Sequence, residues 1–201
     1  MSDAATYTGA AGLDRRRAVA ALLDLLPDAL VVTGLGSPTY DVYAAGPRAT
    51  NFYLWGAMGG AVPMALGLAL AQPERSVLAI TGDGEQLMGI GSLASVAACA
   101  PANLSIVVLD NGHFGETGMQ ASHTSLGTDL TAVARGFGIS CTLTITSMGQ
   151  LNDLAAQAAE RSGTTFARVM IGLQETARAM PPRDGVANKN SFRAALGRGT
   201  F

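Results

Sequence analysis

Charge is scarce in this 201-residue sequence, in which only 14 % of the residues are charged and the formal net charge is −2. Nucleic acids and anionic membranes are bound by clustered Lys and Arg, so the composition gives no footprint for either partner. With 48 % hydrophobic residues and abundant Gly and Ala, the sequence predicts a surface partly covered by other chains. We expect an oligomer whose chain is long enough to bury a core of its own.

Cysteines and long apolar runs are also lacking. Cys99 and Cys141 are too isolated for a disulfide framework or a Cys-based metal site, and we expect both to be core thiols in a reducing compartment. The longest apolar stretch, 56–71, is broken by Pro63 and is shorter than the ~20 residues of a membrane span. The N-terminal residues have no basic region followed by an apolar one, as a signal peptide would. We therefore expect a cytoplasmic protein without a membrane segment.

Apolar runs alternate with helical patterns along the chain. Short apolar runs predict strands at 29–34, 77–81, 104–109, 141–145 and 165–171. Helical spacing predicts helices at 14–26, 56–71, 90–99, 129–136, 149–161 and 190–196. Continuous apolar strands between helices are typical of a parallel sheet covered on both faces. We predict an α/β fold in which 1–201 form one domain and 1–12 a flexible leader, with ligands at the carboxyl ends of the strands.

One carboxylate stands at the end of a predicted buried strand. Asp83 follows the run 77–81 and lies between Gly82 and Gly84. A buried carboxylate is costly unless it is paired or binds a metal. Flanking glycines let backbone N–H groups approach phosphate oxygens, and Mg²⁺ prefers oxygen ligands that it shares with phosphates. Asp83 is therefore predicted to hold Mg²⁺ beside a phosphate; the alternative is turn chemistry, because Asp favours Gly-flanked turns.

A second ligand is expected from the neighbouring strand end. Asn111 follows the run 104–109 and opens a polar, Gly-rich loop that extends to about residue 127. Residues 85–109 suffice for one helix and one strand, which is the length of crossover that joins adjacent parallel strands. We therefore expect Asp83 and Asn111 to lie side by side at one edge of the sheet.

These motifs together resemble the thiamine-diphosphate-binding motif, which has Gly-Asp-Gly followed by Asn-Asn, or by its Asp-Asn variant as at 110–111. The stretch "NFYLWGAMGGAVPMALGLALA" resembles the segment of that superfamily that clasps the cofactor, and "VVTGLGSP" resembles its first diphosphate loop. The resemblance is to the diphosphate-binding domain and covers about 29–138. Within the superfamily the chain is most similar to the β-type subunits and C-terminal halves of sulfopyruvate and phosphonopyruvate decarboxylases.

The resemblance implies a site for thiamine diphosphate and Mg²⁺. The implied Mg²⁺ ligands are Asp83, the Asn111 side chain and the backbone carbonyl of His113. The residues implied to contact the diphosphate are Ser37, Gly82, Gly84 and Glu85. The Gly56 carbonyl would accept a hydrogen bond from the aminopyrimidine, and Met58 would hold the cofactor bent, a role that suits a polarizable thioether. Core packing for Met58 and turn capping for Ser37 are the alternatives.

Some positions depart from the family pattern or stay open. Glu85 stands where Ser is frequent, so Glu85 would offer its backbone N–H and turn its side chain away. Asp110 replaces the first Asn, and we interpret it as a support of the site. The only histidines, His113 and His123, either contact substrate or are solvated. The run Arg15–Arg17 is predicted to be a solvated helix face.

A partner chain is a further implication of the resemblance. In this superfamily a glutamate from a different domain activates the pyrimidine ring, and the predicted sheet domain takes up nearly the whole sequence. We therefore expect a separate pyrimidine-binding subunit that supplies the glutamate, in a heterotetramer or larger assembly. No acid of this chain is assigned to proton transfer. Cations that face a sulfonate or phosphonate are expected on the partner, because Lys and Arg are few near the predicted loops.

The leading functional hypothesis is the diphosphate- and Mg²⁺-binding subunit of a two-chain 2-oxo acid decarboxylase. An acetolactate-synthase-like carboligase would use the same cofactor site, and a cofactor-binding subunit without turnover is a third hypothesis. A nucleotide-binding Rossmann domain is disfavoured, because no G-x-G-x-x-G links the first strand to its helix. The sequence leaves open which small 2-oxo acid is the substrate.

Overall fold

A parallel sheet of six strands forms the centre of the computed structural model, which describes residues 12–199. The strand order is β2-β1-β3-β4-β8-β7, and every neighbouring pair is parallel. The strands are β1 (Leu30–Thr33), β2 (Asn51–Tyr53), β3 (Val77–Gly82), β4 (Leu104–Asp110), β7 (Cys141–Ile145) and β8 (Thr165–Met170). The five predicted strands and the α/β class are thus confirmed, and β2 is an additional edge strand.

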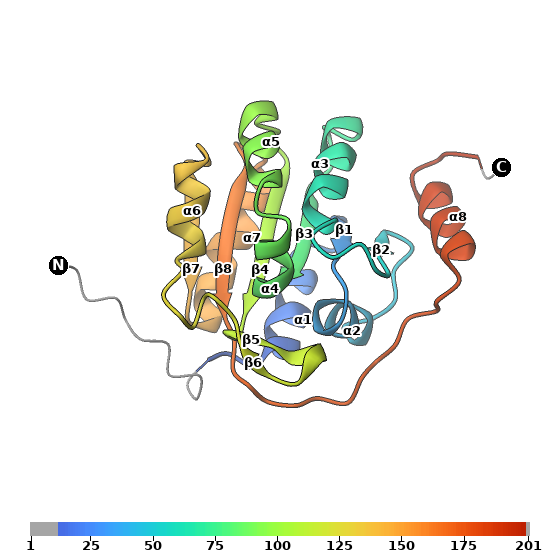
Figure 1. The fold of residues 1–201 in the computed structure, drawn as a ribbon. Helices are drawn as coiled ribbons and strands as arrows, with labels where there is room; N and C mark the ends of the chain where they lie inside the picture. Colours follow the sequence, from blue (N-terminus) through green and yellow to red (C-terminus); the bar gives the residue numbers. More distant parts are fainter. Residues whose placement is uncertain (1–11, 200–201) are drawn as a thin grey trace.

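Helices cover both faces of the sheet (Figure 1). Alternate strand residues point to opposite faces, so Val31 packs in one apolar cluster and Val32 in the other. The first cluster includes residues of α1 (Arg15–Leu25), α2 (Ser37–Ala44) and α7 (Leu151–Glu160). The second includes residues of α3 (Ala61–Ala71), α5 (Ser92–Cys99), α6 (Leu130–Gly136) and α8 (Gly185–Ala195). The six predicted helices are confirmed, with shifted ends.

The start of α3 differs most from its prediction. The helix begins at Ala61, because Gly56, Ala57 and Gly59 have φ angles of 81°, 50° and 86°, which lie outside the right-handed helical region. The expected loop after β1 is also shorter, since α2 begins at Ser37 with a proline in its first turn, a favourable position for that residue. The short helix α4 (Asp83–Met88) follows β3 directly and was not predicted.

Some predictions concern single residues. The side chain of Asp14 caps α1, as its position suggested, by accepting a hydrogen bond from the backbone N–H of Arg17. The expectation that both thiols are buried is wrong, since Cys99 is exposed and Cys141 is only partly buried. Residues 1–11 of the predicted leader lie outside the described residues. Among residues 12–199 no helix has the length and apolar character to cross a bilayer.

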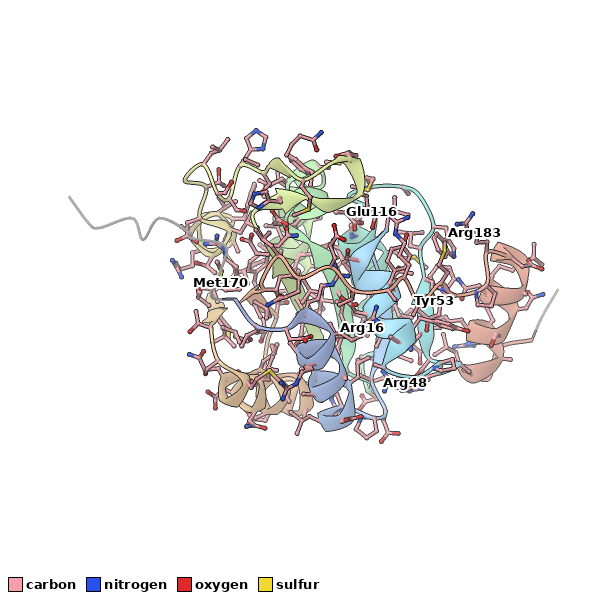
Figure 2. The ribbon with its side chains drawn as sticks, turned by 90° about the horizontal axis from the view of Figure 1, so that it is seen from below. Arg16, Arg48, Tyr53, Glu116, Met170 and Arg183 are labelled. Carbon is pink, nitrogen blue, oxygen red and sulfur yellow. The ribbon has the colours of Figure 1, made fainter. Side chains whose placement is uncertain are left out.

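Two segments lie across the carboxyl ends of the central strands (Figure 1). The first is a small antiparallel hairpin, β5 (His113–Phe114) and β6 (Gln120–Ala121), with a 3₁₀ turn at Gly115–Thr117 between them. The second, which we call the connecting segment, is residues 171–184 between β8 and α8. Figure 2 looks at this edge from below and shows the connecting segment running from Met170 toward Arg183 and α8. Both segments bring polar side chains to the edge where ligands bind in parallel sheets.

Candidate functional site

A cavity of about 210 Å³ opens at the carboxyl edge of the sheet. The predicted site residues that line it are Ser37, Met58, Gly82, Asp83, Gly84, Glu85, Asn111 and His113. Gly56 is the predicted contact that does not line it. The structure therefore gathers residues from four separate segments of the sequence around one space, while their individual roles stay predictions.

Asp83 and Asn111 come from neighbouring strand ends, as the crossover length predicted. Strands β3 and β4 pair in parallel, with Gly82 opposite Leu109. Asp83 follows Gly82 as the first residue of α4, and Asn111 follows the last residue of β4. The adjacent ends of β3 and β4 therefore bring both side chains to the edge at which the cavity lies.

The Asp83 carboxylate is buried and is held by two hydroxyl groups. Its Oδ2 accepts hydrogen bonds from Ser122 Oγ and, at 3.1 Å, from Thr124 Oγ1, and the two hydroxyls lie 2.9 Å apart. Burial raises the pKa of Asp83 to about 6, and the nearby charge of Asp110 acts in the same direction, while the two hydroxyl groups oppose the rise. An unpaired charge in this position favours the approach of a cation.

Asp110 is engaged away from the cavity. Its Oδ2 pairs with Arg168 Nε at 2.6 Å, and its Oδ1 accepts hydrogen bonds from the Gly112 N–H at 2.9 Å and from Thr124 Oγ1 at 2.8 Å. Asp110 is fully buried and does not line the cavity. This arrangement fits the interpretation of Asp110 as a support: Thr124 links it to Asp83, and Arg168 neutralises its charge.

Asn111 and His113 form a tight local turn. Asn111 Oδ1 accepts a hydrogen bond from the His113 backbone N–H at 3.0 Å, and His113 Nδ1 lies 2.9 Å from the Asn111 carbonyl oxygen. An amide oxygen has two lone pairs, so Asn111 Oδ1 keeps capacity for a metal. His113 lines the cavity, whereas His123 is exposed, does not line it, and packs edge-on against Phe114 with ring centroids 6.5 Å apart.

The Glu85 side chain is buried between the loops that follow β1 and β2. It lies so close to Gly34 that a Cβ atom at position 34 would lie 1.6 Å from Oε2. Burial raises the pKa of Glu85, and the Thr81 hydroxyl and the backbone N–H groups of Gly59 and Ala61 partly oppose the rise. No hydrogen bond of regular geometry reaches either carboxylate oxygen from the described residues. The carboxylate thus faces the loops after β1 and β2, and the predicted role of the backbone N–H stays a prediction.

Met58 lies on a turn that packs tightly against α4. A Cβ atom on Gly59 would lie 2.8 Å from the Gly89 nitrogen, so only glycine permits this approach. Met58 itself is 42 % exposed and lines the cavity. Core packing, which was the alternative explanation for this residue, is therefore wrong. Its predicted contact with a bent cofactor stays a prediction.

The prediction for the arginine run was wrong at two of its three positions. Arg15 Nε and Arg16 Nε lie 3.0 Å and 3.2 Å from the two oxygens of Asp41, which is fully buried. The Arg15 side chain is only 13 % exposed and lines the cavity. Arg17 alone is an exposed residue. No local pattern joins Asp41, which lies on α2, to the first helix.

Sequence reasoning also missed Ser122, Thr124 and Arg168. The sequence carries no signal for the first two, because the buried positions of the segment 121–124 are the polar residues Ser122 and Thr124. Their target, Asp83, is 39 and 41 residues away, so no local pattern identifies the contact. The arginine lies on β8, and strand pairing of β4 with β8 places it opposite Val108.

Comparison with known families agrees with this geometry. The model of the family "Thiamine pyrophosphate enzyme, C-terminal TPP binding domain" matches residues 35–169. The chain belongs to this thiamine pyrophosphate (thiamine diphosphate) enzyme family. The match covers the site segments from the loop before α2 to β8, but it leaves out Arg15 and α8.

Members of the thiamine diphosphate family among characterised proteins are similar over most of this chain. Phosphonopyruvate decarboxylase of Streptomyces viridochromogenes is 42 % identical over 75 % of this chain, which spans only 37 % of that enzyme. Sulfopyruvate decarboxylase subunit beta of Methanothermobacter thermautotrophicus is 38 % identical over 79 % of this chain and 82 % of the subunit. A crystal structure described as a thiamin diphosphate-dependent enzyme, from Mycobacterium smegmatis, matches with a TM-score of 0.69 and 28 % identity, over 82 % of this chain and 32 % of that one.

The cavity fits the pyrophosphate that the family name implies. A Cβ atom on Gly82 would meet no atom within 4 Å, so the cavity wall is open at this position. Among the described residues no three His, Cys, Asp or Glu side chains gather as metal ligands. The cavity donors at the ends of β3 and β4 include the Asp83 carboxylate, the Asn111 amide oxygen and backbone carbonyls, a set that suits Mg²⁺ shared with phosphate oxygens.

Proposed function

We propose that this chain is the diphosphate- and Mg²⁺-binding catalytic subunit of a thiamine diphosphate-dependent 2-oxo acid decarboxylase of the sulfopyruvate or phosphonopyruvate type. The observation that carries the proposal is the cavity between the ends of β3 and β4, lined by Asp83 and Asn111. Relatives with 34–42 % identity that are named for these activities support it.

Each part of the cofactor would be held by a different segment. Asp83, Asn111 Oδ1 and the His113 carbonyl would hold Mg²⁺. The diphosphate would be bound by Ser37, Gly82, Gly84 and Glu85. Met58 and the Gly56 carbonyl would contact the thiazolium and aminopyrimidine rings. When bound, thiamine diphosphate supplies the electron sink that allows a 2-oxo acid to lose carbon dioxide.

The chain's own residues would also exclude water from the site and orient the Asp83 carboxylate. The Phe114 ring lies against Gly84, where an added Cβ atom would be 2.5 Å from Cε1. This aromatic wall limits water beside Asp83 and strengthens the attraction of its carboxylate for a cation. Ser122 and Thr124 hold the carboxylate in one orientation, so less order must be created when the metal binds.

A separate pyrimidine-binding subunit belongs to the proposal. The acids that line the cavity are Asp83, Glu85 and Glu116; the first two are buried in the phosphate-side loops, and the third pairs with Arg178 at 3.2 Å. Asp83 and Glu85 thus lie on the side of the cavity where the diphosphate would bind, and Glu116 is paired, so the activating glutamate would come from the partner. Relatives named "subunit beta" favour such a partner, and we propose a heterotetramer or larger assembly. The two free cysteines favour a cytoplasmic location.

A carboligase remains the second candidate, because the same cavity serves both reactions. Acetolactate synthase large subunit of Parasynechococcus marenigrum is 35 % identical over 59 % of this chain. Identity and coverage are higher for the decarboxylase relatives, which favours decarboxylation. A cofactor-binding subunit without turnover is the third candidate.

The test is co-expression with the product of an adjacent gene, followed by assays with Mg²⁺ and thiamine diphosphate. We expect carbon dioxide release from one or a few small 2-oxo acids, with an aldehyde product. A 2-hydroxy-2-alkyl-3-oxo acid product would support the carboligase, and cofactor binding without carbon dioxide release would support the third candidate. Asp83→Ala should abolish cofactor binding, measured by calorimetry, whereas Asp153→Ala on exposed α7 should not. A complex that takes up no cofactor would refute the proposal.

A further inference from the structure

A buried cation stands at the phosphate end of the cavity. Arg15 lines it and also a second cavity of about 210 Å³, and the two cavities share Ser37, Asn111, Gly115 and Glu116. Among the described residues, Arg15 is the arginine that borders both spaces. The cavities thus adjoin, with one guanidinium at their boundary.

The Arg15 guanidinium is fixed in place. Its Nε lies 3.0 Å from Asp41 Oδ2, and its Nη2 donates a hydrogen bond to Thr176 Oγ1 at 2.6 Å. Arg16 is held in the same way, with Nε near Asp41 and Nη2 donating to the Ala177 carbonyl at 2.7 Å. In the part of the chain that the structure describes, Nη1 of Arg15 forms no hydrogen bond, so it is available to a ligand. A preorganised guanidinium loses little rotamer freedom on binding.

The group around Asp41 carries a surplus positive charge. Arg15 and Arg16 share the single carboxylate of Asp41, which leaves one net positive charge among these three side chains. The charge of Asp14 also reaches Asp41, but Asp14 is exposed, so solvent and salt screen it. Burial raises the pKa of Asp41, and a proton on this carboxyl group would only increase the surplus. An uncompensated charge this close to the protein interior is costly, so an anionic ligand would stabilise the group.

Other charges at the second cavity do not cancel this surplus. Arg178 and Glu116 pair with each other at 3.2 Å, and Arg178 also lies over the Tyr40 ring at 5.9 Å from its centroid. Glu175 lines the second cavity but is exposed, where solvent and salt screen its charge. Figure 2 shows Arg16 and Glu116 on opposite sides of the connecting segment.

The position of Arg15 indicates which part of thiamine diphosphate it would contact. Ser37 and Asn111, which are at the predicted diphosphate and metal end, border both cavities together with Arg15. Met58 and the predicted site residues 82–85 line the first cavity alone. We infer that Arg15 is a binding residue for the terminal phosphate of the diphosphate. The inference rests on the proposed function and deepens it: a guanidinium binds phosphate through strong, charge-assisted hydrogen bonds. This cation belongs to the chain itself and would face the cofactor, whereas the cations that the sequence analysis expects on the partner would face a sulfonate or phosphonate substrate.

Calorimetry on the full-length chain tests the inference, with Mg²⁺ and inorganic pyrophosphate as the probe. Arg15→Gln should weaken pyrophosphate binding by about 10- to 100-fold, the usual effect of losing a charge-assisted hydrogen bond. Arg15→Lys should retain part of the affinity. Arg17→Gln, the same charge change on the exposed side of α1, should have no effect. Circular dichroism of each variant checks the fold, and Thr176→Val, which frees Nη2, gives a milder second variant with a smaller loss.

A comparison of the affinities for thiamine monophosphate and thiamine diphosphate shows which phosphate group Arg15 binds. If Arg15 holds the terminal phosphate, Arg15→Gln should reduce the affinity for the diphosphate but leave that for the monophosphate nearly unchanged. Equal losses for both would overturn the inference, as would Arg15→Gln binding pyrophosphate like Arg17→Gln. An unchanged pyrophosphate affinity together with a raised KM for an anionic 2-oxo acid would assign Arg15 to substrate instead. If the complex of the Arg15→Gln variant with its partner subunit binds thiamine diphosphate with wild-type affinity and decarboxylates, the inference about Arg15 is refuted but the proposed function is not. If the wild-type complex neither binds the cofactor nor turns over, the proposed function is refuted as well.

Discussion

Replacement of Asp83 by Asn should stabilise the metal-free protein. The Asp83 carboxyl is buried, and its pKa is raised from 3.8 to about 6 by burial and by the charge of Asp110. The amide of Asn has nearly the same shape, accepts the hydrogen bonds of Ser122 and Thr124, and cannot ionise. The variant therefore avoids the cost of a buried charge that the wild type carries at neutral pH.

The magnitude follows from the pKa. Because the folded-state pKa is the higher one, the folded protein binds more protons than the unfolded chain between about pH 4 and pH 6, and the free energy of unfolding falls as the pH rises through this range. At about 1.36 kcal/mol per pKa unit, a rise from 3.8 to about 6 corresponds to about 3 kcal/mol. The free energy of unfolding of Asp83→Asn should exceed that of the wild type by about this amount at pH 7.5 and by almost nothing near pH 4.

Urea unfolding with EDTA present measures the difference at both pH values, and Asp153→Asn on the exposed surface of α7 is the matched control. Mg²⁺ with pyrophosphate should stabilise the wild type but not Asp83→Asn, because only the carboxylate attracts the cation. For the same reason, the Mg²⁺ affinity of the wild type should fall as the pH drops below about 6. If the free energies of unfolding of Asp83→Asn and the wild type differ by the same amount at pH 4 and pH 7.5, the electrostatic argument is refuted.

Three further variants test the packing around the site. Gly89→Ala should destabilise the fold by about 1–3 kcal/mol, measured by urea unfolding, because its Cβ would lie 2.4 Å from the Gly59 carbonyl oxygen; an unchanged midpoint would contradict this close contact. Gly82→Ala should change the free energy of unfolding by less than about 0.5 kcal/mol but weaken pyrophosphate binding in calorimetry, since its methyl group would enter the cavity. Arg168→Met should cost about 3–5 kcal/mol by leaving Asp110 as an unpaired buried charge, and adding Asp110→Asn should recover most of the loss; no recovery would argue against this charge balance.

Several features of the site followed from the sequence because they are local or are set by connection length. The apolar runs identified five of the six strands, and the crossover between β3 and β4 required their ends to be adjacent. The Gly-flanked Asp83 and the following Asn111 could thus be placed together from the order and spacing of the residues alone. The same reasoning found the N-cap of α1 at Asp14.

Tertiary structure alone decided which side chains support those two residues. Thr124 reaches Asp83 across 41 positions, Arg168 reaches Asp110 across 58, and Arg15 reaches Thr176 across 161. Such contacts depend on how strands are ordered and how the connecting segment crosses the sheet, and neither is encoded in a local periodicity. The turn before α3 was missed for a related reason: Gly59, with its positive φ angle, packs closely against the distant Gly89, whereas the apolar composition of the segment favours a helix throughout. The sequence therefore determined which residues could bind the ligand, and packing between distant segments determined their charge and orientation.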